Sequence, residues 1–535
     1  MLCYIRAGEN PVGRNENCFN IKEKVDGQIR WYDFKNEVRE WQPVPSTIMI
    51  TTSDKESIIV AKEKEVNNWK MNDVFEEVPF TNQHVISTRW VITTKEVENI
   101  PITKARLVAR GFEDDLGYGR KVDSPTCARE SLCLTLSLIA IKGWKCMAMD
   151  IKTAFLQGKP IEREIYLLPP KEFDDGINVW KLEKAVYGLN EASWYWYTRV
   201  KDEFIKIGLT MSKFDEALFY KEKDGLCIGI IAVHVDDFIY GGLPEFETVI
   251  VSLKSVFIVG SELSFPMKFL GINLDQDDQH IIYNQTDYIN GMDFDVKLLS
   301  GDKGRSLDSK EQRQFRGIVG QLNWIASRTN PLISFDVCQL SVKLSQATVH
   351  DFNTARKIKQ QAMVPVNLRF VKLEGPVFFL AYCDASFANL PDGSSQGGYI
   401  IFIADEKNNV SPITWCSKKL PRVCRSTLAA EVMAIIETVD MCCWLRKIFV
   451  DIFDGKLLKT IIRTDNKSAF DNINSTTPAN EKRTRVDIAA IRQSIYNQEI
   501  DLQWIRGENQ LADPLTKQGA DSFKLKNVLN KGKII

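Results

Sequence analysis

The pattern of apolar and polar positions between Ala61 and about Tyr288 mixes two periods. Amphipathic stretches such as residues 61–75 have the spacing of helices, whereas short β-branched runs such as residues 85–94 and 226–235 have that of strands. This mixture predicts an α+β unit in which helices pack on strands.

The remainder of the chain has two further patterns. Residues 289–375 are more helical, with residues 315–326 and 351–362 as the clearest periodic segments. From Val377 onward, the pattern predicts three strands, a helix, a strand, two helices and a last strand. We therefore expect an α/β region here, with a mixed sheet and helices packed on it.

The composition is that of an ordinary globular chain with room for about three domains. Its 535 residues are 44% hydrophobic and 26% charged, and 69 Lys and Arg nearly balance 70 Asp and Glu. The net charge therefore supplies no overall positive field, and a nucleic-acid partner would have to be held by local basic patches.

Cysteine usage and hydropathy bear on the compartment. The 12 cysteines include no CxxC pair, and Cys442 and Cys443 are adjacent on a predicted helix, which favours reduced thiols over disulfides or zinc ligands. No signal-like N-terminus and no run of about 18 apolar residues is present. We expect a soluble protein of the cytosol or nucleus without a membrane partner.

Two adjacent aspartates interrupt an apolar stretch. Asp236 and Asp237 lie between β-branched runs within Ile230–Gly242. Two carboxylates about 4 Å apart repel by roughly 4 kcal/mol at an effective dielectric of 20, so a shared site implies a cation or shifted pKa values. The alternative is a hairpin turn with two solvated acids.

A third acid, Asp150, ends a short predicted strand on which Cys146, Ala148 and Asp150 share a face. It could be an N-cap for a following helix. If it instead lies beside Asp236 and Asp237, the three carboxylates fit hard divalent cations. Two Mg²⁺ ions about 4 Å apart would then serve phosphoryl transfer.

Such a reaction also needs cations for the phosphates. Lys104, Arg106 and Arg110 could supply them, the arginines as bidentate donors, or they could be the solvated face of a strand. Phe155 could stand behind the nucleotide sugar and exclude a ribose 2′-hydroxyl, or it could be a core aromatic.

These residues lie in motifs that together resemble the reverse transcriptase of copia-type LTR-retrotransposon Pol polyproteins. Their order over some 250 residues is more specific than any one motif alone. The resemblance extends from about Trp69 through RWV (89–91), KARLVARGF (104–112), DSPT (123–126), MDIKTAFLQG (149–158), LEKAVYGL (182–189), HVDD (234–237) and FLGI (269–272) to VGQLNWIASRTNP (319–331).

The resemblance implies a right-hand polymerase with fingers, palm and thumb. Such an enzyme copies an RNA or DNA template from a DNA primer, using deoxynucleoside triphosphates and Mg²⁺ or Mn²⁺, two ions per active site. By position, Asp150, Asp236 and Asp237 would be the catalytic, metal-binding carboxylates. The nucleotide-binding residues would be Lys104, Arg106, Arg110 and Phe155.

Four later acids could each have a structural role at a strand end or helix start. Together, Asp384, Glu431, Asp465 and Asp513 resemble the ribonuclease H domain of the same elements, within the motifs YCDAS (382–386), WCSKK (415–419), STLAAE (426–431), TDNKSA (464–469) and ADPLTK (512–517). The resemblance implies that they are catalytic and bind two metal ions while the RNA strand of an RNA:DNA hybrid is cut.

A basic run accompanies this second set of acids. It could hold the hybrid backbone or form a solvated loop. The run consists of Lys418, Lys419, Arg422 and Arg425.

Four positions depart from the family pattern. His234 replaces a Tyr, and Asn190, Glu191 and Trp194 stand where Lys, Gln and Arg are common. We expect Glu191 to repel the incoming triphosphate, so that Glu191→Gln would improve nucleotide affinity. Residues 481–493 contain no His, although the family often has one there. A degenerate or host-adopted relic that binds nucleic acid without copying it is therefore the alternative.

The patterns and the resemblance together give a division of the chain. We expect part of a Pol polyprotein, since neither a protease motif nor a zinc module is visible. The predicted segments are 1–55 (linker or upstream remnant), 56–290 (reverse transcriptase fingers and palm), 291–375 (thumb and connection), 376–518 (RNase H-like domain) and 519–535 (C-terminal tail).

Overall fold

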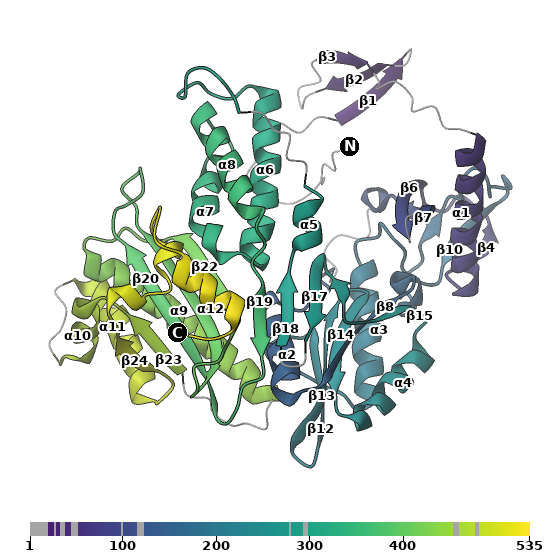
Figure 1. The fold of residues 1–535 in the computed structure, drawn as a ribbon. Coiled ribbons are helices and arrows are strands. Elements are labelled where there is room, and N and C mark those ends of the chain that lie inside the picture. Colours follow the sequence, from purple (N-terminus) through teal and green to yellow (C-terminus); the bar gives the residue numbers. More distant parts are fainter. Residues whose placement is uncertain are drawn as a thin grey trace. The chain divides into compact units, whose positions relative to one another are not determined.

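The computed structural model describes residues 20–25, 28–32, 38–43, 52–97, 100–114, 122–277, 280–292, 298–452, 460–476 and 481–534. The chain forms two compact units (Figure 1). The first contains residues 1–124 and 153–199, and the second contains residues 125–152 and 200–535. Most of the predicted 1–55 linker lies outside the described residues.

The first unit is built from short sheets, antiparallel except for the parallel pairing of β5 with β9, and one long helix. Within it, α1 packs on β7. Its sheets are β1-β2-β3 (Asn20–Val25, Gln28–Tyr32, Val38–Pro43), β4-β10-β9-β5 (Phe75–Pro79, Asn178–Leu182, Tyr166–Leu167, Val85–Ile86) and the hairpin of β6 (Thr88–Val97) with β7 (Ile100–Ala109). Its helices are α1 (Thr52–Met71), the 3-10 turns η1 (Gly111–Glu113) and η3 (Ala154–Gln157), and the start of α3 (Ala192–Lys206).

Two motifs of the first unit touch backbone to backbone. A Cβ on Gly111 would lie 2.1 Å from the carbonyl oxygen of Gly188, and a Cβ on Gly188 would lie 2.0 Å from that of Ala109. Gly188 also has a φ of 98°, which glycine adopts without steric cost. The glycines of the motifs KARLVARGF and LEKAVYGL are thus required by their close approach.

The second unit begins with a six-stranded sheet of order β11-β12-β13-β14-β8-β15. Its buried strand faces are lined by aliphatic and aromatic residues, and α2 packs against β13 and β14. The elements are β11 (Thr210–Met211), β12 (Leu218–Lys223), β13 (Leu226–His234), β14 (Asp237–Gly242), β8 (Lys145–Ile151), β15 (Val259–Ser264), α2 (Arg129–Lys142), η4 (Pro244–Phe246) and α4 (Glu247–Val256).

A four-stranded sheet and several helices follow in the second unit. The sheet has the order β16-β17-β18-β19, and the helices α6, α7 and α8 pack on one another. The elements are β16 (Met267–Phe269), β17 (Ile272–Gln276), β18 (His280–Asn284), β19 (Leu368–Val371), α5 (Thr286–Asn290), α6 (Ser309–Arg328), η5 (Pro331–Ile333), α7 (Ser334–Val342) and α8 (Val349–Ala362).

The C-terminal part of the second unit is a five-stranded mixed sheet, β22-β21-β20-β23-β24, with α9 packed on it (Figure 1). The first three strands are antiparallel, and β23 and β24 run parallel to β20. The elements are β20 (Val377–Ser386), β21 (Gln396–Asp405), β22 (Val410–Lys419), α9 (Thr427–Ile452), β23 (Thr460–Thr464), α10 (Lys467–Asn474), α11 (Lys482–Tyr496), β24 (Asp501–Trp504), η6 (Gly507–Asn509), η7 (Asp513–Leu515) and α12 (Phe523–Lys531).

Helix α2 joins the two larger sheets of the second unit, because it packs on β13 and also on β22. Its Arg129 donates to the carbonyl of Ser327 at 2.5 Å and to Glu130 at 2.7 Å, and it also donates to Thr414 on β22. One apolar core therefore extends across both sheets.

The mixed fold class and the order of elements after Val377 are confirmed. In the described part of the chain, no helix has the length and apolar character of a membrane span. Ten described cysteines, Cys442 and Cys443 among them, are free thiols. The predicted segment boundaries stay predictions.

Candidate functional site

The first candidate site is the hairpin turn between β13 and β14. His234 pairs with Asp237 across the ladder, so Val235 and Asp236 form a two-residue turn. Val235 has a φ of 58°, which is an outlier for a β-branched residue and costs about 1–3 kcal/mol. The hairpin turn that was the alternative for Asp236 and Asp237 is therefore present, and its backbone is strained at Val235.

The same ladder brings Asp150 to this turn. Asp237 is the direct partner of Asp150, because β14 pairs antiparallel with β8, and the amide of Ile151 donates to the carbonyl of Asp236 at 2.8 Å. Directly opposite residues have their side chains on one face, with Cβ atoms about 4.5–5.5 Å apart. The N-cap alternative for Asp150 is wrong, because Thr153 occupies the N-cap position of η3.

A glycine on the neighbouring strand leaves room for the Asp150 carboxylate. The β15–β8 register shifts between Val259 and Ser261, and a Cβ on the intervening Gly260 would lie 2.5 Å from Asp150 Oδ2. Half-buried carboxylates at the ends of adjacent strands provide the hard oxygen ligands that Mg²⁺ takes. The donor set of Asp150, Asp236 and Asp237 fits such an ion.

His234 lines a cavity next to this turn. The cavity has a volume of about 210 Å³ and also contains Arg129, Phe269 and Arg328. Burial lowers the pKa of His234, and Arg328 lowers it further. This shift favours the neutral imidazole, although Asp236 acts in the opposite direction.

The three predicted phosphate-binding cations lie in the first unit, on or directly after β7. Lys104, Arg106 and Arg110 are exposed and alternate with the buried Ala105, Leu107 and Ala109. Burial raises the pKa of the nearby Glu65, and Lys104 and Arg106 partly offset this rise. Lys104 and Arg106 share one face of β7, and Arg110 directly follows the strand. This arrangement is compatible both with phosphate binding and with a solvated surface.

Phe155 is half-buried on η3 and contacts Tyr187, with the ring centroids 5.1 Å apart. The Arg106 guanidinium lies 5.6 Å from the centroid of the same Tyr187 ring. Two predicted nucleotide-binding residues from distant parts of the sequence therefore share one aromatic neighbour, Tyr187, a role that nothing in the sequence indicated.

The expectation for Glu191 is wrong. Its side chain is buried, with an exposed residue fraction of 1%, and it accepts a 2.7 Å hydrogen bond from Arg163 Nε. The other end of the Arg163 guanidinium binds both carboxylate oxygens of Asp114, one of them at 2.9 Å. A carboxylate held inside an ion-paired triad is not directed at a triphosphate.

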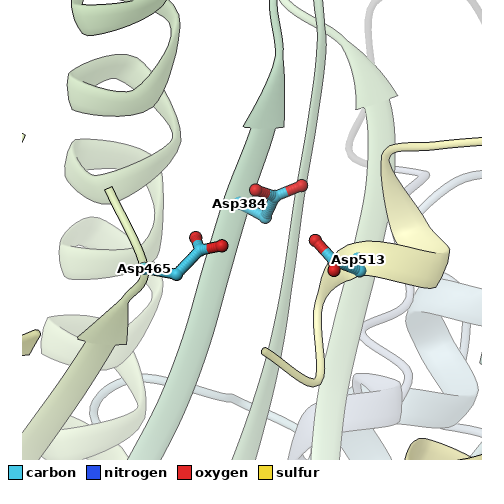
Figure 2. A group of neighbouring side chains, drawn as sticks. All are labelled: Asp384, Asp465 and Asp513. Atoms are coloured by element: carbon cyan, nitrogen blue, oxygen red, sulfur yellow. The ribbon is translucent and has the colours of Figure 1, made fainter. Parts of the chain in front are cut away.

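The second candidate site lies on the C-terminal sheet, where three carboxylates from separate elements converge (Figure 2). Asp384 lies near the end of β20, Asp465 directly follows β23, and Asp513 begins η7. One oxygen of each lies within 4.8 Å of the others, and among the described residues this is the one such group of three or more. Asp513 caps no helix; the N-cap of η7 is Ala512.

Glu431 on α9 is close enough to the carboxylates of Asp384 and Asp465 to be affected by their charges. Burial raises its pKa, and the charges of Asp384 and Asp465 raise it further. Its Oε2 is buried and has no hydrogen-bond partner in the described part of the chain, which is costly unless a ligand uses it. This unused oxygen supports the fit of a cation to the second site.

Asp384 is almost fully buried, with an exposed fraction of 1%. Burial raises its pKa to about 6, although Lys517 and a hydrogen bond from Thr516 act in the opposite direction. Asp513 and Asp465 add to the rise. This carboxyl group is therefore sensitive to any cation that enters the site.

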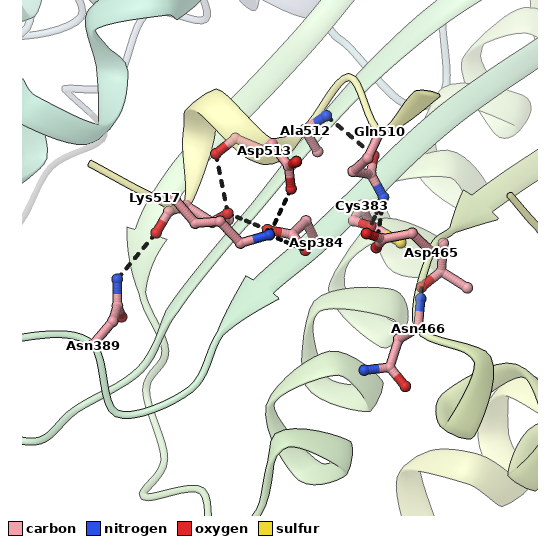
Figure 3. A network of polar contacts seen from close by, with 11 residues as sticks. Cys383, Asp384, Asn389, Asp465, Asn466, Gln510, Ala512, Asp513 and Lys517 are labelled. Atoms are coloured by element: carbon pink, nitrogen blue, oxygen red, sulfur yellow. Dashed lines mark hydrogen bonds and ion pairs between the residues drawn. The ribbon is translucent and has the colours of Figure 1, made fainter. Parts of the chain in front are cut away.

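Lys517 is the cation nearest to this cluster (Figure 3). Its Nζ lies 2.6 Å from Asp513 Oδ1 and 3.3 Å from Asp384 Oδ2. Burial alone would lower the pKa of Lys517, but Asp384 and Asp513 outweigh this effect and raise it. The ADPLTK motif contains both Thr516 and Lys517, yet nothing in the sequence indicated that they contact Asp384.

The basic run, which begins at the end of β22, is largely paired with acids. Lys418 lies 3.1 Å from Glu437, Arg422 lies 2.6 Å from Asp487, and Lys419 contacts Asp392. These side chains remain partly exposed, so they could still bind a backbone. Their positive field is weaker than the sequence alone suggests.

Comparisons with known proteins extend these observations. Residues 67–302 match the family described as "Reverse transcriptase (RNA-dependent DNA polymerase)". The retrovirus-related Pol polyprotein from transposon RE1 of Arabidopsis thaliana is 27% identical over 483 residues, which are 85% of this chain and 32% of that protein. The corresponding protein of transposon TNT 1-94 from Nicotiana tabacum is 25% identical over 526 residues, with coverage of 88% and 37%.

A smaller relative and a solved structure complete the comparison. A putative transposon Ty5-1 protein of Saccharomyces cerevisiae is 29% identical over 320 residues, which are 54% of this chain and 99% of that protein. The structure of the foamy viral protease-reverse transcriptase in complex with double-stranded DNA is similar in fold, with a TM-score of 0.51 and 12% identity, and the match covers 83% of this chain and 69% of that one.

Residues 67–302 thus match the reverse transcriptase family, and the fold is similar to that of a solved reverse transcriptase. Over most of its length the chain is similar to Pol polyproteins of retrotransposons, in agreement with the resemblance seen in its motifs. It spans about a third of the length of the Arabidopsis and tobacco relatives.

Proposed function

We propose that this chain is an RNA-directed DNA polymerase with an associated RNase H activity. Its partners would be an RNA template, a DNA primer, deoxynucleoside triphosphates and RNA:DNA hybrids. The observation that carries the polymerase proposal is the pairing of Asp150 with Asp237 beside the strained turn that holds Asp236. Backbone strain of this kind is characteristic of functional sites.

At the polymerase site, Asp150, Asp236 and Asp237 hold divalent cations beside the primer end. When bound at either site, two Mg²⁺ or Mn²⁺ ions lower the pKa of the attacking hydroxyl or water and offset the charge of the leaving oxygen. Lys104, Arg106 and Arg110 bind the triphosphate oxygens. The Phe155 ring excludes a ribose 2′-hydroxyl.

At the RNase H site, Asp384, Glu431, Asp465 and Asp513 hold the cations. The convergence of three of these carboxylates and the unused buried oxygen of Glu431 support this role. The substrate is the RNA strand of a hybrid, and the bond broken joins phosphorus to the 3′-oxygen.

The alternative is a relic that binds nucleic acid without copying it. Asn190 and Trp194 favour it, because cationic side chains are common at these positions in related enzymes. Glu191 no longer favours it, because Arg163 neutralises that carboxylate inside the first unit.

The experiment that tests the polymerase is extension of a DNA primer on an RNA template by the purified chain with Mg²⁺ or Mn²⁺, beside the variant Asp236→Asn. We expect extension by the wild type and none by the variant. A folded wild type that binds hybrid but does not extend the primer would establish the relic instead.

A further inference from the structure

Lys517 contacts the carboxylate cluster of the second site, and its role there rests on the proposed RNase H function. Lys517 Nζ contacts Asp513 at 2.6 Å and lies within 3.4 Å of each oxygen of Asp384. These oxygens belong to two of the three carboxylates that form the cluster. The ammonium therefore occupies the side of the cluster where a divalent cation would share the same ligands.

An ammonium and a divalent cation cannot use these oxygens together without strong repulsion. Mg²⁺ binds carboxylate oxygens at 2.0–2.1 Å, whereas Lys517 already donates to the same groups. Asp384 is almost completely buried, so water cannot take the place of Lys517 in balancing its charge. In the metal-free protein, Lys517 supplies the positive charge that Asp384 and Asp513 require.

The structure also has room to receive the displaced side chain. Lys517 has an exposed side-chain fraction of 41% and lines a cavity of about 590 Å³ between α7, α8 and the segment after β20. Gln339, Lys343, Asn389 and Lys419 line the same cavity. Donors of this kind bind phosphate oxygens.

Acidic side chains in the cavity are already engaged. Asp351 accepts hydrogen bonds from Thr348, and Asp392 pairs with Lys419. Burial raises the pKa of Asp336, which favours its neutral form.

Asn389 and Gln339 each donate an amide N–H, to Thr516 and Gln396 respectively, and Lys419 pairs with Asp392. The further N–H groups of these side chains, together with Lys343, are the donors that this wall offers to an anionic strand next to the carboxylate cluster.

We propose that Lys517 is an exchangeable counter-ion: it neutralises Asp384 and Asp513 in the metal-free site, and it binds a backbone phosphate of the RNA:DNA hybrid once metal displaces it. Lys517 is a positioning residue in this scheme, because no bond is made or broken at its ammonium. Because Lys517 lies four residues after Asp513, its side chain can reach the carboxylate cluster.

The first arm of the test measures Mn²⁺ binding by calorimetry. The full chain is used with Asp150→Asn and Asp236→Asn, so that the polymerase carboxylates contribute little to the signal. Lys517→Met in this background should tighten Mn²⁺ binding at least about tenfold, because the competing ammonium is gone. Lys407→Met, which removes an exposed lysine paired with Glu374, should leave the affinity unchanged.

The second arm measures binding of a hybrid whose RNA strand is 2′-O-methylated and resists cleavage. In EDTA, wild type and Lys517→Met should bind it equally, since Lys517 is then held by carboxylates. In Ca²⁺, which takes the same oxygen ligands, the variant should bind about three- to tenfold more weakly, with a salt dependence reduced by about one phosphate contact.

Each outcome decides a different point. Unchanged or weaker Mn²⁺ binding by Lys517→Met would overturn the competition, and equal loss of hybrid affinity in EDTA and Ca²⁺ would overturn the exchange. Lys517→Gln provides a second variant if Lys517→Met unfolds, as judged by thermal melting. A folded wild type that neither binds Mn²⁺ at this site nor cleaves hybrid would instead refute the proposed RNase H function.

Discussion

Arg163 and Glu191 form a buried ion pair, with Nε and Oε1 2.7 Å apart. The Arg163 side chain has an exposed fraction of 10% and that of Glu191 2%. Asp114 binds the opposite edge of the guanidinium, so one arginine balances two acids. This triad ties the segment after β7 to the start of α3 within the first unit.

Glu191→Gln should therefore destabilise the chain rather than improve nucleotide binding. The amide keeps an acceptor for Arg163 but removes half of the charge that the guanidinium balances, at a cost of about 1–3 kcal/mol. Urea unfolding should show this loss, whereas the KM for deoxynucleotides should not change. Glu183→Gln, the same substitution at an exposed site, is the matched control.

The reciprocal change sharpens this prediction. Arg163→Gln leaves two buried carboxylates without their cation, and we expect it to cost more than Glu191→Gln, about 3–5 kcal/mol. A lower KM together with unchanged stability in Glu191→Gln would instead mean that this carboxylate acts on the triphosphate.

Gly260→Ala should abolish primer extension without unfolding the chain. The new Cβ would lie 2.5 Å from Asp150 Oδ2, and the carboxylate is the atom group most able to move away. We expect at least a hundredfold loss of extension, as is typical for an ångström-scale displacement of a reacting group. Full extension by a folded Gly260→Ala protein would exclude Asp150 from the metal site.

The control for this change is Gly317→Ala. Gly317 lies within α6, and its Cβ would meet nothing within 4 Å. Alanine is favoured over glycine in a helix by about 1 kcal/mol. Stability should rise slightly and extension should stay unchanged, so a loss in both variants would indicate a general effect of added Cβ atoms.

Local periodicity was sufficient to predict the C-terminal elements, because each strand and helix there has its own apolar pattern. The alternation after Val377 predicts β20, β21 and β22 in order, and the long apolar helix that follows is α9. Local periodicity could not predict the strand register that brings Asp150 opposite Asp237. Register depends on pairing between distant strands, and a shift of one residue would reverse the faces.

The cations that pair with acidic side chains were the contacts that the sequence predicted least well. Glu191 is followed by aromatic residues and gives no local sign of Arg163, which lies 28 residues earlier. Lys517 lies close to Asp513 in sequence, but its second partner, Asp384, precedes it by 133 residues. Ion pairs of this range depend on tertiary packing, so the sequence indicated the acids and missed their cations.

Separate substitutions should divide the two activities. Asp236→Asn should abolish primer extension and leave hybrid cleavage intact, whereas Asp465→Asn should do the reverse, because the two residues belong to different carboxylate sets of the second unit. Each loss should exceed about a hundredfold, because changes to the outer shell of a metal site alone cost about 10- to 100-fold. Measurement of both activities on the same preparation tests this, and loss of both from either change would argue against two sites.

The pH dependence of the metal-free protein should report on Asp384. Its pKa is about 6 in the folded chain and 3.8 for an ordinary aspartate, so the folded state holds the proton more tightly. Stability is then greatest when the group is protonated and falls as the pH rises from about 4 to 7. The loss through this one group is up to about 3 kcal/mol.

Asp384→Asn removes this titration. In EDTA, urea unfolding should show the wild type losing stability relative to Asp384→Asn between pH 4 and 7, and Mg²⁺ at pH 7 should stabilise the wild type more than the variant. Asp224→Asn, on an exposed turn with a φ of 53° that asparagine tolerates, should parallel the wild type throughout. If the wild type and Asp384→Asn instead keep a constant difference across this range, burial does not raise the pKa of Asp384, and its carboxylate is already ionised before metal enters.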